Sequence, residues 1–199
     1  MAGWEYSLAN HSFIVDLRPD IFMRTFFTAT LVFLASSCAF AADATAPVRQ
    51  VMDITVKNWS GEQEEWKYIF DEDMLNSLFS KRFVETYHQA AKKPAYDTEN
   101  NEPGDPFGYD VVTSSQDGCP IQELAIAPAQ PKDGGVNDVK VSFKLWSCMD
   151  ENDMKNMVNE VHFDVIEENG KPVIDDIHRV GDDGTDSLVV EMDGIIKGE

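Results

Sequence analysis

The sequence has few cysteines, few basic residues and no long apolar run. Its three cysteines include no CxxC pair and no Cys/His cluster at the spacing of zinc ligands. It also lacks a glycine-rich phosphate loop, a nucleophile elbow and an EF-hand, even where acids cluster at 150–153 and 182–186. The apolar run at 26–34 is too short to span a bilayer. We therefore expect no motif-defined catalytic site, no metal, no cofactor and no membrane span.

Basic residues are strongly outnumbered by acidic ones. The chain has 16 Lys and Arg against 36 Asp and Glu, which gives a formal net charge of -20 at pH 7. Such a surface repels nucleic acid and anionic lipid, so neither is an expected partner. Keeping a domain soluble is the simplest use of this charge, but it also attracts positively charged partners. The expected partner is a basic protein or a cationic small ligand.

A signal for export precedes the main part of the chain. Arg24 stands before the apolar run at 26–34, and small residues lead to an Ala-x-Ala site at Ala39 and Ala41. We predict that residues 23–41 are a secretory signal peptide that is cleaved after Ala41. The protein is then expected to be periplasmic or secreted.

Two alternatives concern the residues around this signal. Residues 1–22 have no targeting features, so we expect a mis-assigned start or an extension. Cys38 follows small residues, as the cysteine of a bacterial lipoprotein signal does, so lipidation and an anchor in the envelope are the alternative to cleavage. Residues 42–47 are expected to form a flexible leader, and residues 48–199 a single domain.

Two cysteines follow the predicted signal, Cys119 and Cys148. An even pair in an exported domain predicts a disulfide, because the compartment is oxidising. A metal pair or a reactive thiol is the alternative. Neither is supported, since no further ligands lie at a suitable spacing.

The first half of the mature chain has a helical pattern. Apolar residues at helical spacing predict a helix that begins at Val48 and ends near Trp59. A second helix is expected to begin near Gln63. A third follows Asp71, a plausible N-cap, and continues through Tyr87. The aromatic residues along these helices are expected to be core rather than ligand contacts.

Strands follow the helices. The pattern predicts short strands at 109–116 and 121–127 and a longer one at 139–146. The tail at 187–196 fits either a helix or a strand. Helices followed by an antiparallel meander define an α+β fold, in which the N-terminal helices pack on one face of a curved antiparallel sheet.

The clearest pattern is a β-hairpin between Val158 and His178. Apolar and polar residues alternate on its arms, which is the period of a strand with one buried face. A two-residue turn at Asn169 and Gly170 would set an apolar face beside a polar one, so we predict a three-residue turn that includes Glu168. The predicted pairs are Glu167 with Lys171, Val165 with Val173, Phe163 with Asp175, and Val161 with Ile177.

The same register places imidazoles beside carboxylates on the other face. It pairs His162 with Asp176 and His178 with Glu160. A carboxylate can orient an imidazole and raise its basicity, which suits proton transfer by an enzyme. Ordinary cross-strand ion pairs on a solvated face are the simpler interpretation, so no catalytic residue is assigned.

Three short motifs resemble a family of bacterial envelope proteins of unknown function. They are Tyr109-Asp110, Ser115-Gln116-Asp117 and the run from Asn169 to Ile177. The family belongs to the nuclear transport factor 2-like superfamily, so the resemblance implies a cone of helices wrapped by a curved antiparallel sheet. Sheet faces in this superfamily often dimerise, which implies a homodimer through the sheet face. The family brings no catalytic residues, because a fold does not define a function.

We therefore expect an exported, non-catalytic binding protein of the bacterial envelope. With a basic partner it would be an inhibitor or immunity-type protein. The alternative is an isomerase-like or dehydratase-like enzyme, because some members of the superfamily use an Asp/His pair in the cone pocket. Its catalytic residues would be His162, Asp176, His178 and Glu160.

Overall fold

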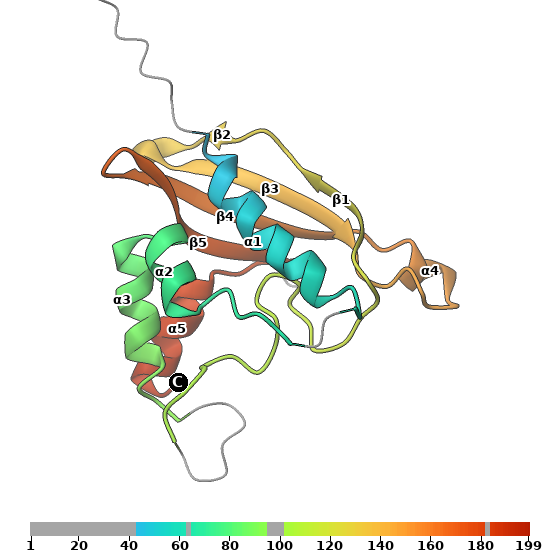
Figure 1. The fold of residues 1–199 in the computed structure, drawn as a ribbon, viewed down its shortest axis with the longest axis horizontal. Coiled ribbons are helices and arrows are strands. Elements are labelled where there is room, and N and C mark those ends of the chain that lie inside the picture. The colour runs from blue at the N-terminus through green and yellow to red at the C-terminus, as the bar shows by residue number, and fades with distance from the viewer. Residues whose placement is uncertain (1–42, 63–64, 95–101, 182–183) are drawn as a thin grey trace, which may run out of the picture. The chain divides into compact units, whose positions relative to one another are not determined.

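The computed structural model describes residues 43–62, 65–94, 102–181 and 184–199 (Figure 1). The predicted signal peptide, its cleavage site at Ala39 and Ala41, the possible lipidation site Cys38 and residues 1–22 lie outside the described residues. The described part combines helices with an antiparallel sheet, so the predicted α+β class is confirmed. No helix in this part is long and apolar enough to cross a membrane.

Helix α1 (Thr45–Asn58) begins earlier than the sequence predicts. The Asp43 carboxylate accepts hydrogen bonds from the Thr45 N–H at 3.0 Å and the Thr45 hydroxyl at 2.7 Å, which holds the first turn. Thr45 and Pro47 are buried. The expected flexible leader at 42–47 is thus helical from Thr45 onward, which corrects that boundary.

The single helix predicted after Asp71 is divided into α2 (Glu72–Leu78) and α3 (Lys81–Ala90). Ser80 breaks it, because its hydroxyl accepts a hydrogen bond from the Phe83 N–H at 3.1 Å and caps α3. The helix predicted from Gln63 is not formed by residues 65–70, which are irregular. At Ser80 a local hydrogen bond thus overrides an apolar spacing that fits a continuous helix.

The strands form one antiparallel sheet in the order β1-β3-β4-β5-β6, with β2 paired to β3. They are β1 (Gln122–Ile126), β2 (Gln130–Pro131), β3 (Asn137–Lys144), β4 (Asn159–Glu168), β5 (Lys171–Gly181) and β6 (Gly184–Thr185). The remaining helices are η1 (Asp133–Gly135), α4 (Asn152–Lys155) and α5 (Leu188–Lys197). The tail is therefore a helix. The strand predicted at 109–116 is instead a turn.

One face of the sheet carries the hydrophobic core. The inward residues of β3 and β4 are almost completely buried and pack with apolar residues of the helices. Helices α1, α2, α3 and α5 all contact β5. The inward residues are Val139, Val141, Phe143, Val161, Phe163 and Val165. The opposite face carries their polar neighbours.

The hairpin between β4 and β5 has a shorter turn than the sequence predicts. Glu168 pairs with Lys171, so the turn consists of Asn169 and Gly170 alone. Both have positive φ, 53° and 76°, as a type I′ turn requires. A two-residue turn on its own would set the apolar face of one strand beside the polar face of the other. A β-bulge at Asp175 removes that mismatch and restores the apolar alignment beyond it.

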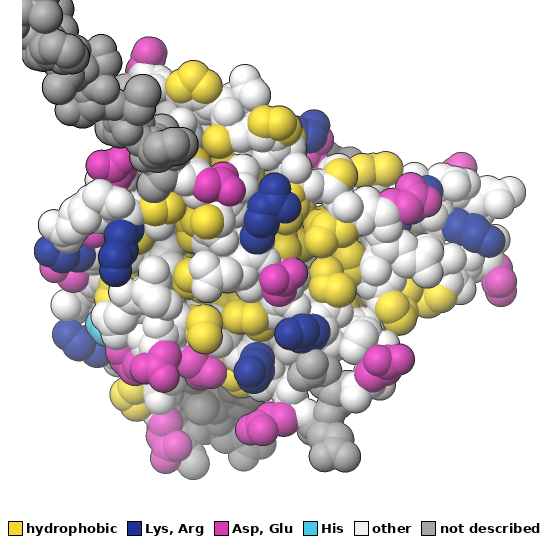
Figure 2. Space-filling model, turned by 45° about the horizontal axis from the view of Figure 1, so that its top comes forward, with side chains coloured by type: hydrophobic (Ala, Val, Ile, Leu, Met, Phe, Trp, Pro, Cys, Tyr) yellow, Lys and Arg dark blue, Asp and Glu magenta, His cyan; other side chains and the backbone are white. Residues whose placement is uncertain are grey.

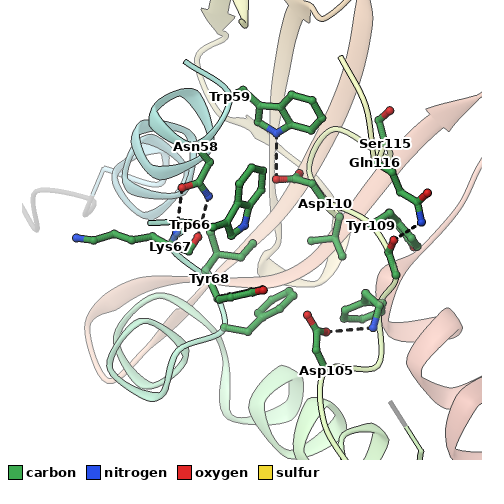
Figure 3. Close-up of a pocket in the computed structure, with 15 residues that line it drawn as sticks. Asn58, Trp59, Trp66, Lys67, Tyr68, Asp105, Tyr109, Asp110, Ser115 and Gln116 are labelled. Carbon is green, nitrogen blue, oxygen red and sulfur yellow. Dashed lines mark hydrogen bonds between the residues drawn. The ribbon is translucent and has the colours of Figure 1, made fainter. Parts of the chain in front are cut away.

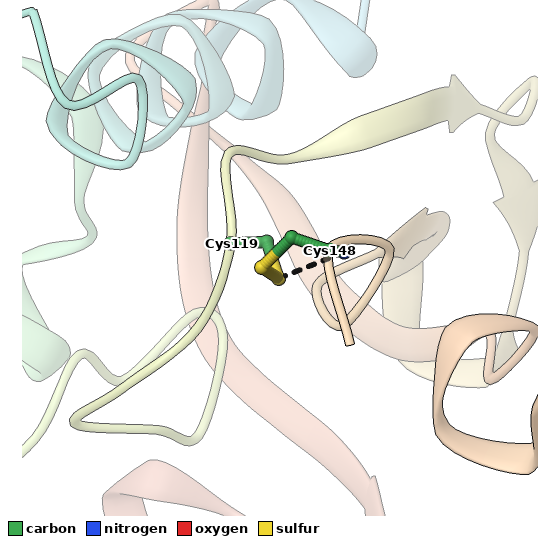
Figure 4. Close-up of a disulfide and its surroundings, with 2 residues drawn as sticks. All are labelled: Cys119 and Cys148. Carbon is green, nitrogen blue, oxygen red and sulfur yellow. Dashed lines mark hydrogen bonds between the residues drawn. A yellow bond between two sulfur atoms is a disulfide. The ribbon is translucent and has the colours of Figure 1, made fainter. Parts of the chain in front are cut away.

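The predicted disulfide between Cys119 and Cys148 is present (Figure 4). It joins the segment before β1 to the segment after β3, with 5.8 Å between the two Cα atoms. The Cys119 N–H also donates to the Leu145 carbonyl at 2.7 Å. The loop that precedes β1 is therefore attached covalently and by a hydrogen bond to the end of β3.

Candidate ligand-binding cleft

A cleft of about 500 Å³ lies between two segments that the sequence analysis did not assign to a site. One segment is the end of α1 with residues 65–70, and the other is the loop at 105–116 (Figure 3). Volumes of this size are typical of small-molecule sites. Its aromatic lining consists of Trp59, Trp66, Tyr68, Phe70, Phe107 and Tyr109.

The first wall is held in place by Asn58. Its side-chain amide donates to the Lys67 carbonyl at 2.7 Å, and its carbonyl oxygen accepts from the Lys67 N–H at 3.0 Å. This two-way clamp fixes the backbone between Trp66 and Tyr68. Trp66 and Tyr68 are 43% and 53% exposed. In Figure 3 the Lys67 side chain points away from the cleft.

The second wall depends on Asp110. Its Oδ1 accepts hydrogen bonds from the Val112 and Thr113 N–H groups, both at 2.9 Å, which closes the turn. Its Oδ2 accepts from the Trp59 indole N–H at 3.2 Å, so one carboxylate connects both walls (Figure 3). Trp59 and Trp66 then meet edge to face with ring centroids 6.0 Å apart.

Other polar groups of the lining also bond within the protein. The Gln116 amide donates to the Gly108 carbonyl at 2.5 Å, and the Ser115 hydroxyl donates to the Asp117 carbonyl at 2.6 Å. The Asp105 carboxylate accepts from the Phe107 N–H at 3.0 Å. The cleft therefore presents mainly ring surfaces and carboxylate charge.

Tyr109 is held in place by contacts with Arg179 of β5 and Glu191 of α5. Its hydroxyl donates to Glu191 at 2.6 Å and accepts from Arg179. The Arg179 guanidinium lies 5.2 Å from the Tyr109 ring centroid, a cation–π contact. Burial, followed by the hydrogen bond to Glu191, raises the pKa of the Tyr109 phenol. Tyr109 is thus a rigid part of the wall.

Acidic side chains outnumber basic ones in the lining of the cleft. Asp105 and Asp110 line it with one basic residue, Lys67, and among the described residues no Lys or Arg forms an ion pair with Asp110. The carboxylates also affect Tyr87, whose ring packs against Phe107 with centroids 6.5 Å apart. The pKa of Tyr87 is raised first by burial and then by nearby carboxylates, Asp105 foremost.

The histidine and carboxylate residues predicted from the hairpin lie elsewhere, on the outer face of the sheet. His162 Nε2 lies 2.8 Å from Glu160, and its Nδ1 lies 3.0 Å from Asp138. His178 Nε2 lies 2.9 Å from Asp164 and 3.7 Å from Asp176. The predicted pairs, His162 with Asp176 and His178 with Glu160, are therefore wrong.

The observed register explains the correction. His162 stands directly opposite His178, while Asp164 stands opposite both Asp138 and Asp176. Each imidazole consequently interacts with carboxylates that lie two positions along the strands from the pair of histidines. The hydrogen bond to Asp164 raises the pKa of His178, although burial opposes it. Burial alone would raise the pKa of Asp164, but hydrogen bonds from His178 and Lys132 outweigh it and lower the pKa to about 2.

None of the four candidate catalytic residues lines the aromatic cleft. A second cavity, of about 220 Å³ beside Pro172, contains none of them either. Within the described ranges, no group of three or more His, Cys, Asp and Glu is placed to hold a metal ion. These four residues therefore form ion pairs on the outer face and line neither of these two cavities of the described part of the chain.

Acidic residues do not dominate every face of the molecule. Figure 2 shows Lys and Arg interspersed with Asp and Glu, around apolar patches, on the face that it presents. A positively charged partner would therefore find no uniform acidic field on that face. A local site gives a more specific basis for recognition than net charge.

Sequence reasoning missed the cleft because its two walls are distant in the sequence. The resembling motifs Tyr109-Asp110 and Ser115-Gln116-Asp117 do fall on or beside the second wall. Comparisons with models of protein families, with curated proteins and with solved structures gave no match.

Proposed function

We propose that the protein is an exported, non-catalytic binding protein whose positively charged ligand occupies the aromatic cleft. The observation that carries the proposal is the combination, in one cleft, of two partly exposed aromatic side chains, Trp66 and Tyr68, with two carboxylates, Asp105 and Asp110. A cation over the face of Trp or Tyr is attracted by the ring quadrupole, by about 0.5–2 kcal/mol for each such contact. The Asp110 charge, which no basic side chain neutralises within the described residues, adds to that attraction.

Two kinds of ligand share this chemistry. One is a basic side chain of an envelope protein, for which this chain would act as an inhibitor or immunity-type protein. The other is a small organic cation. In both cases the excess of 36 acidic over 16 basic residues favours association, and binding should strengthen at low ionic strength.

The proposal includes export and a cone-type fold. Removal of the signal at 23–41 would release the protein into an oxidising compartment, and the Cys119–Cys148 disulfide is compatible with that location. The helices on one face of the antiparallel sheet are compatible with the nuclear transport factor 2-like fold that the motifs imply. Lipidation at Cys38 and a homodimer through the outer sheet face stay predictions.

A fluorescence titration of the protein purified from its native envelope tests the proposal. Trp59 and Trp66 line the cleft, so the cations tetramethylammonium and methylguanidinium should quench or shift the emission. Neutral tert-butanol and the anion acetate should not. Trp66→Ala should remove most of the response. Trp146→Phe is the matched control, because Trp146 does not line the cleft. Equal responses to charged and neutral probes would refute a cation site.

The enzyme alternative gains no support from a specific contact. Proton transfer requires an acid and a base that face a bound substrate. Here His162 and His178 interact with partly buried carboxylates of the sheet and line neither cavity.

A further inference from the structure

We propose that the cleft selects a quaternary trimethylammonium group over a guanidinium or a primary ammonium. This inference rests on the proposed function, because it names the class of cation that the same cleft binds. It is carried by a second observation, which is that Asn58, Asp110 and Gln116, three polar side chains of the walls, already form hydrogen bonds within the protein.

Asp110 supplies charge but little hydrogen-bonding capacity. Its Oδ1 already accepts from two backbone N–H groups and, at 3.2 Å, from the Thr113 hydroxyl. Its Oδ2 accepts from the Trp59 indole. A guanidinium binds a carboxylate best through two parallel N–H···O bonds, one to each oxygen. Asp110 Oδ1 already accepts three hydrogen bonds, so Asp110 accepts such a pair only by giving up one of them.

The other wall offers little compensation. The Asn58 amide is used on both sides by the Lys67 backbone, and the Gln116 amide donates to Gly108. An ammonium or guanidinium that leaves water here would lose hydrogen bonds that the walls do not replace, which is unfavourable. A trimethylammonium group has no N–H donors, so it meets no such loss.

The aromatic surfaces provide what a trimethylammonium group requires. Its charge is spread over methyl groups that pack against ring faces, which is the use of aromatic cages in the recognition of quaternary ammonium ligands. Trp66 and Tyr68 expose their rings at the mouth of the cleft, and Trp59 lies deeper at 9% exposure. Tyr109 contributes less, since Arg179 already occupies a position over its ring.

A trimethylammonium group can come from a free choline-like molecule or from a phosphocholine lipid headgroup. Both present the same cation, and the experiment separates them. Choline is the first probe, and phosphatidylcholine vesicles are the second. The neutral control is 3,3-dimethyl-1-butanol, which has the shape of choline with carbon in place of the charged nitrogen.

The test is isothermal titration calorimetry of the intact protein with choline, 3,3-dimethyl-1-butanol and methylguanidinium, together with vesicle co-sedimentation. Choline should bind at least about fivefold more tightly than 3,3-dimethyl-1-butanol, as one lost cation–π contact would give. It should also bind more tightly than methylguanidinium, which loses hydrogen bonds with water that the walls do not replace. Binding to vesicles as well as to choline assigns the lipid headgroup as a source, and binding to choline alone assigns the free molecule. Either result supports the inference.

Three outcomes are distinguishable failures. Tighter binding of methylguanidinium overturns the selectivity and leaves the proposed cation site intact. Equal binding of choline and its neutral isostere overturns both, because the charge then contributes nothing. No binding of any probe also overturns both.

Substitutions at Trp66 provide a readout that does not depend on the buried groups. Trp66 is 43% exposed, so its replacement should leave the fold intact. Trp66→Leu keeps an apolar side chain but removes the ring, and it should weaken choline binding about fivefold. Trp66→Phe keeps a ring and should weaken it less. Equal losses in both variants would show that apolar contact, rather than the ring quadrupole, holds the ligand, and would overturn the inference.

Discussion

Removing the disulfide between Cys119 and Cys148 should lower the free energy of unfolding by about 3–4 kcal/mol. The bridge joins residues that are 29 apart in the sequence, and a closed loop of this size restricts the unfolded chain by that amount. Cys119 is only 1% exposed, and its N–H still donates to Leu145 when the bond is absent. The native packing should therefore persist, and the loss should arise in the unfolded state.

Urea unfolding followed by far-ultraviolet circular dichroism measures this change. The oxidised protein is compared with the Cys119→Ala/Cys148→Ala variant and with the reduced protein, whose midpoints should fall together. A loss below about 1 kcal/mol would contradict the reasoning, because it would show that other contacts already restrict the loop. A reduced protein without native circular dichroism in the absence of urea would also contradict it, since packing alone would then be insufficient.

Three further predictions use the same unfolding assay. Ser80→Ala should lower the free energy of unfolding by about 1 kcal/mol or more, because it removes both the α3 cap and the hydrogen bond from Ser80 to Asp175; a neutral effect would exclude capping as a source of stability. Gly118→Ala should be destabilising by about 1–3 kcal/mol, because the added Cβ would lie 2.7 Å from the Leu145 side chain; a neutral effect would mean that this side chain moves freely. The contribution of His178 should be fully present below its ordinary pKa of 6.5 and should be lost as pH rises through its higher folded-state pKa, because Asp164 stabilises the charged imidazole. A His178→Gln variant should lack this component of the pH dependence, and an unchanged profile would contradict the assignment.

Much of the fold could be predicted from local patterns. The alternation on β3 and β4 identified the inward residues, because a strand with one buried face has a period of two. The two cysteines of the predicted mature chain identified the disulfide. Periodicity was less reliable in the helical half. There, a single capping side chain, Ser80, divided a helix whose apolar spacing was continuous.

The candidate cleft could not be predicted in the same way. Its walls are joined by contacts between distant residues, such as Trp59 with Asp110, and no spacing in the sequence reveals them. The aromatic residues of 65–70 matched a helical core stripe, although the segment is irregular and exposes two of its rings. A helical spacing does not distinguish a ring that packs inside from one that faces solvent.

The hairpin register shows how a wrong pairing can still give the correct faces. The prediction set Phe163 opposite Asp175, whereas Phe163 is opposite Ile177 in the structure. Beyond the bulge the partner differs by two residues, which is one full period of the pleat, so each side chain keeps its predicted face while its neighbours change. Between the turn and the bulge the prediction is wrong by one residue, because Val165 is opposite Ile174 and not Val173. The bulge could not be seen in the sequence, because Asp175 looks like any other polar residue of a strand.

The length of the turn and the presence of the bulge therefore decide together which face of the sheet each side chain of β5 occupies. A two-residue turn alone would send every side chain of β5 beyond Ile174 to the wrong side of the sheet, and the additional residue Asp175 reverses that inversion. Asp175 also accepts hydrogen bonds from Ser80 at 2.5 Å and from Arg82 at 2.6 Å, at the start of α3. A hairpin with one more residue in its turn could dispense with Asp175, but it would give up this attachment to the helix. An insertion or deletion in the turn should therefore be tolerated only together with a second change at the bulge that restores the alternation of faces.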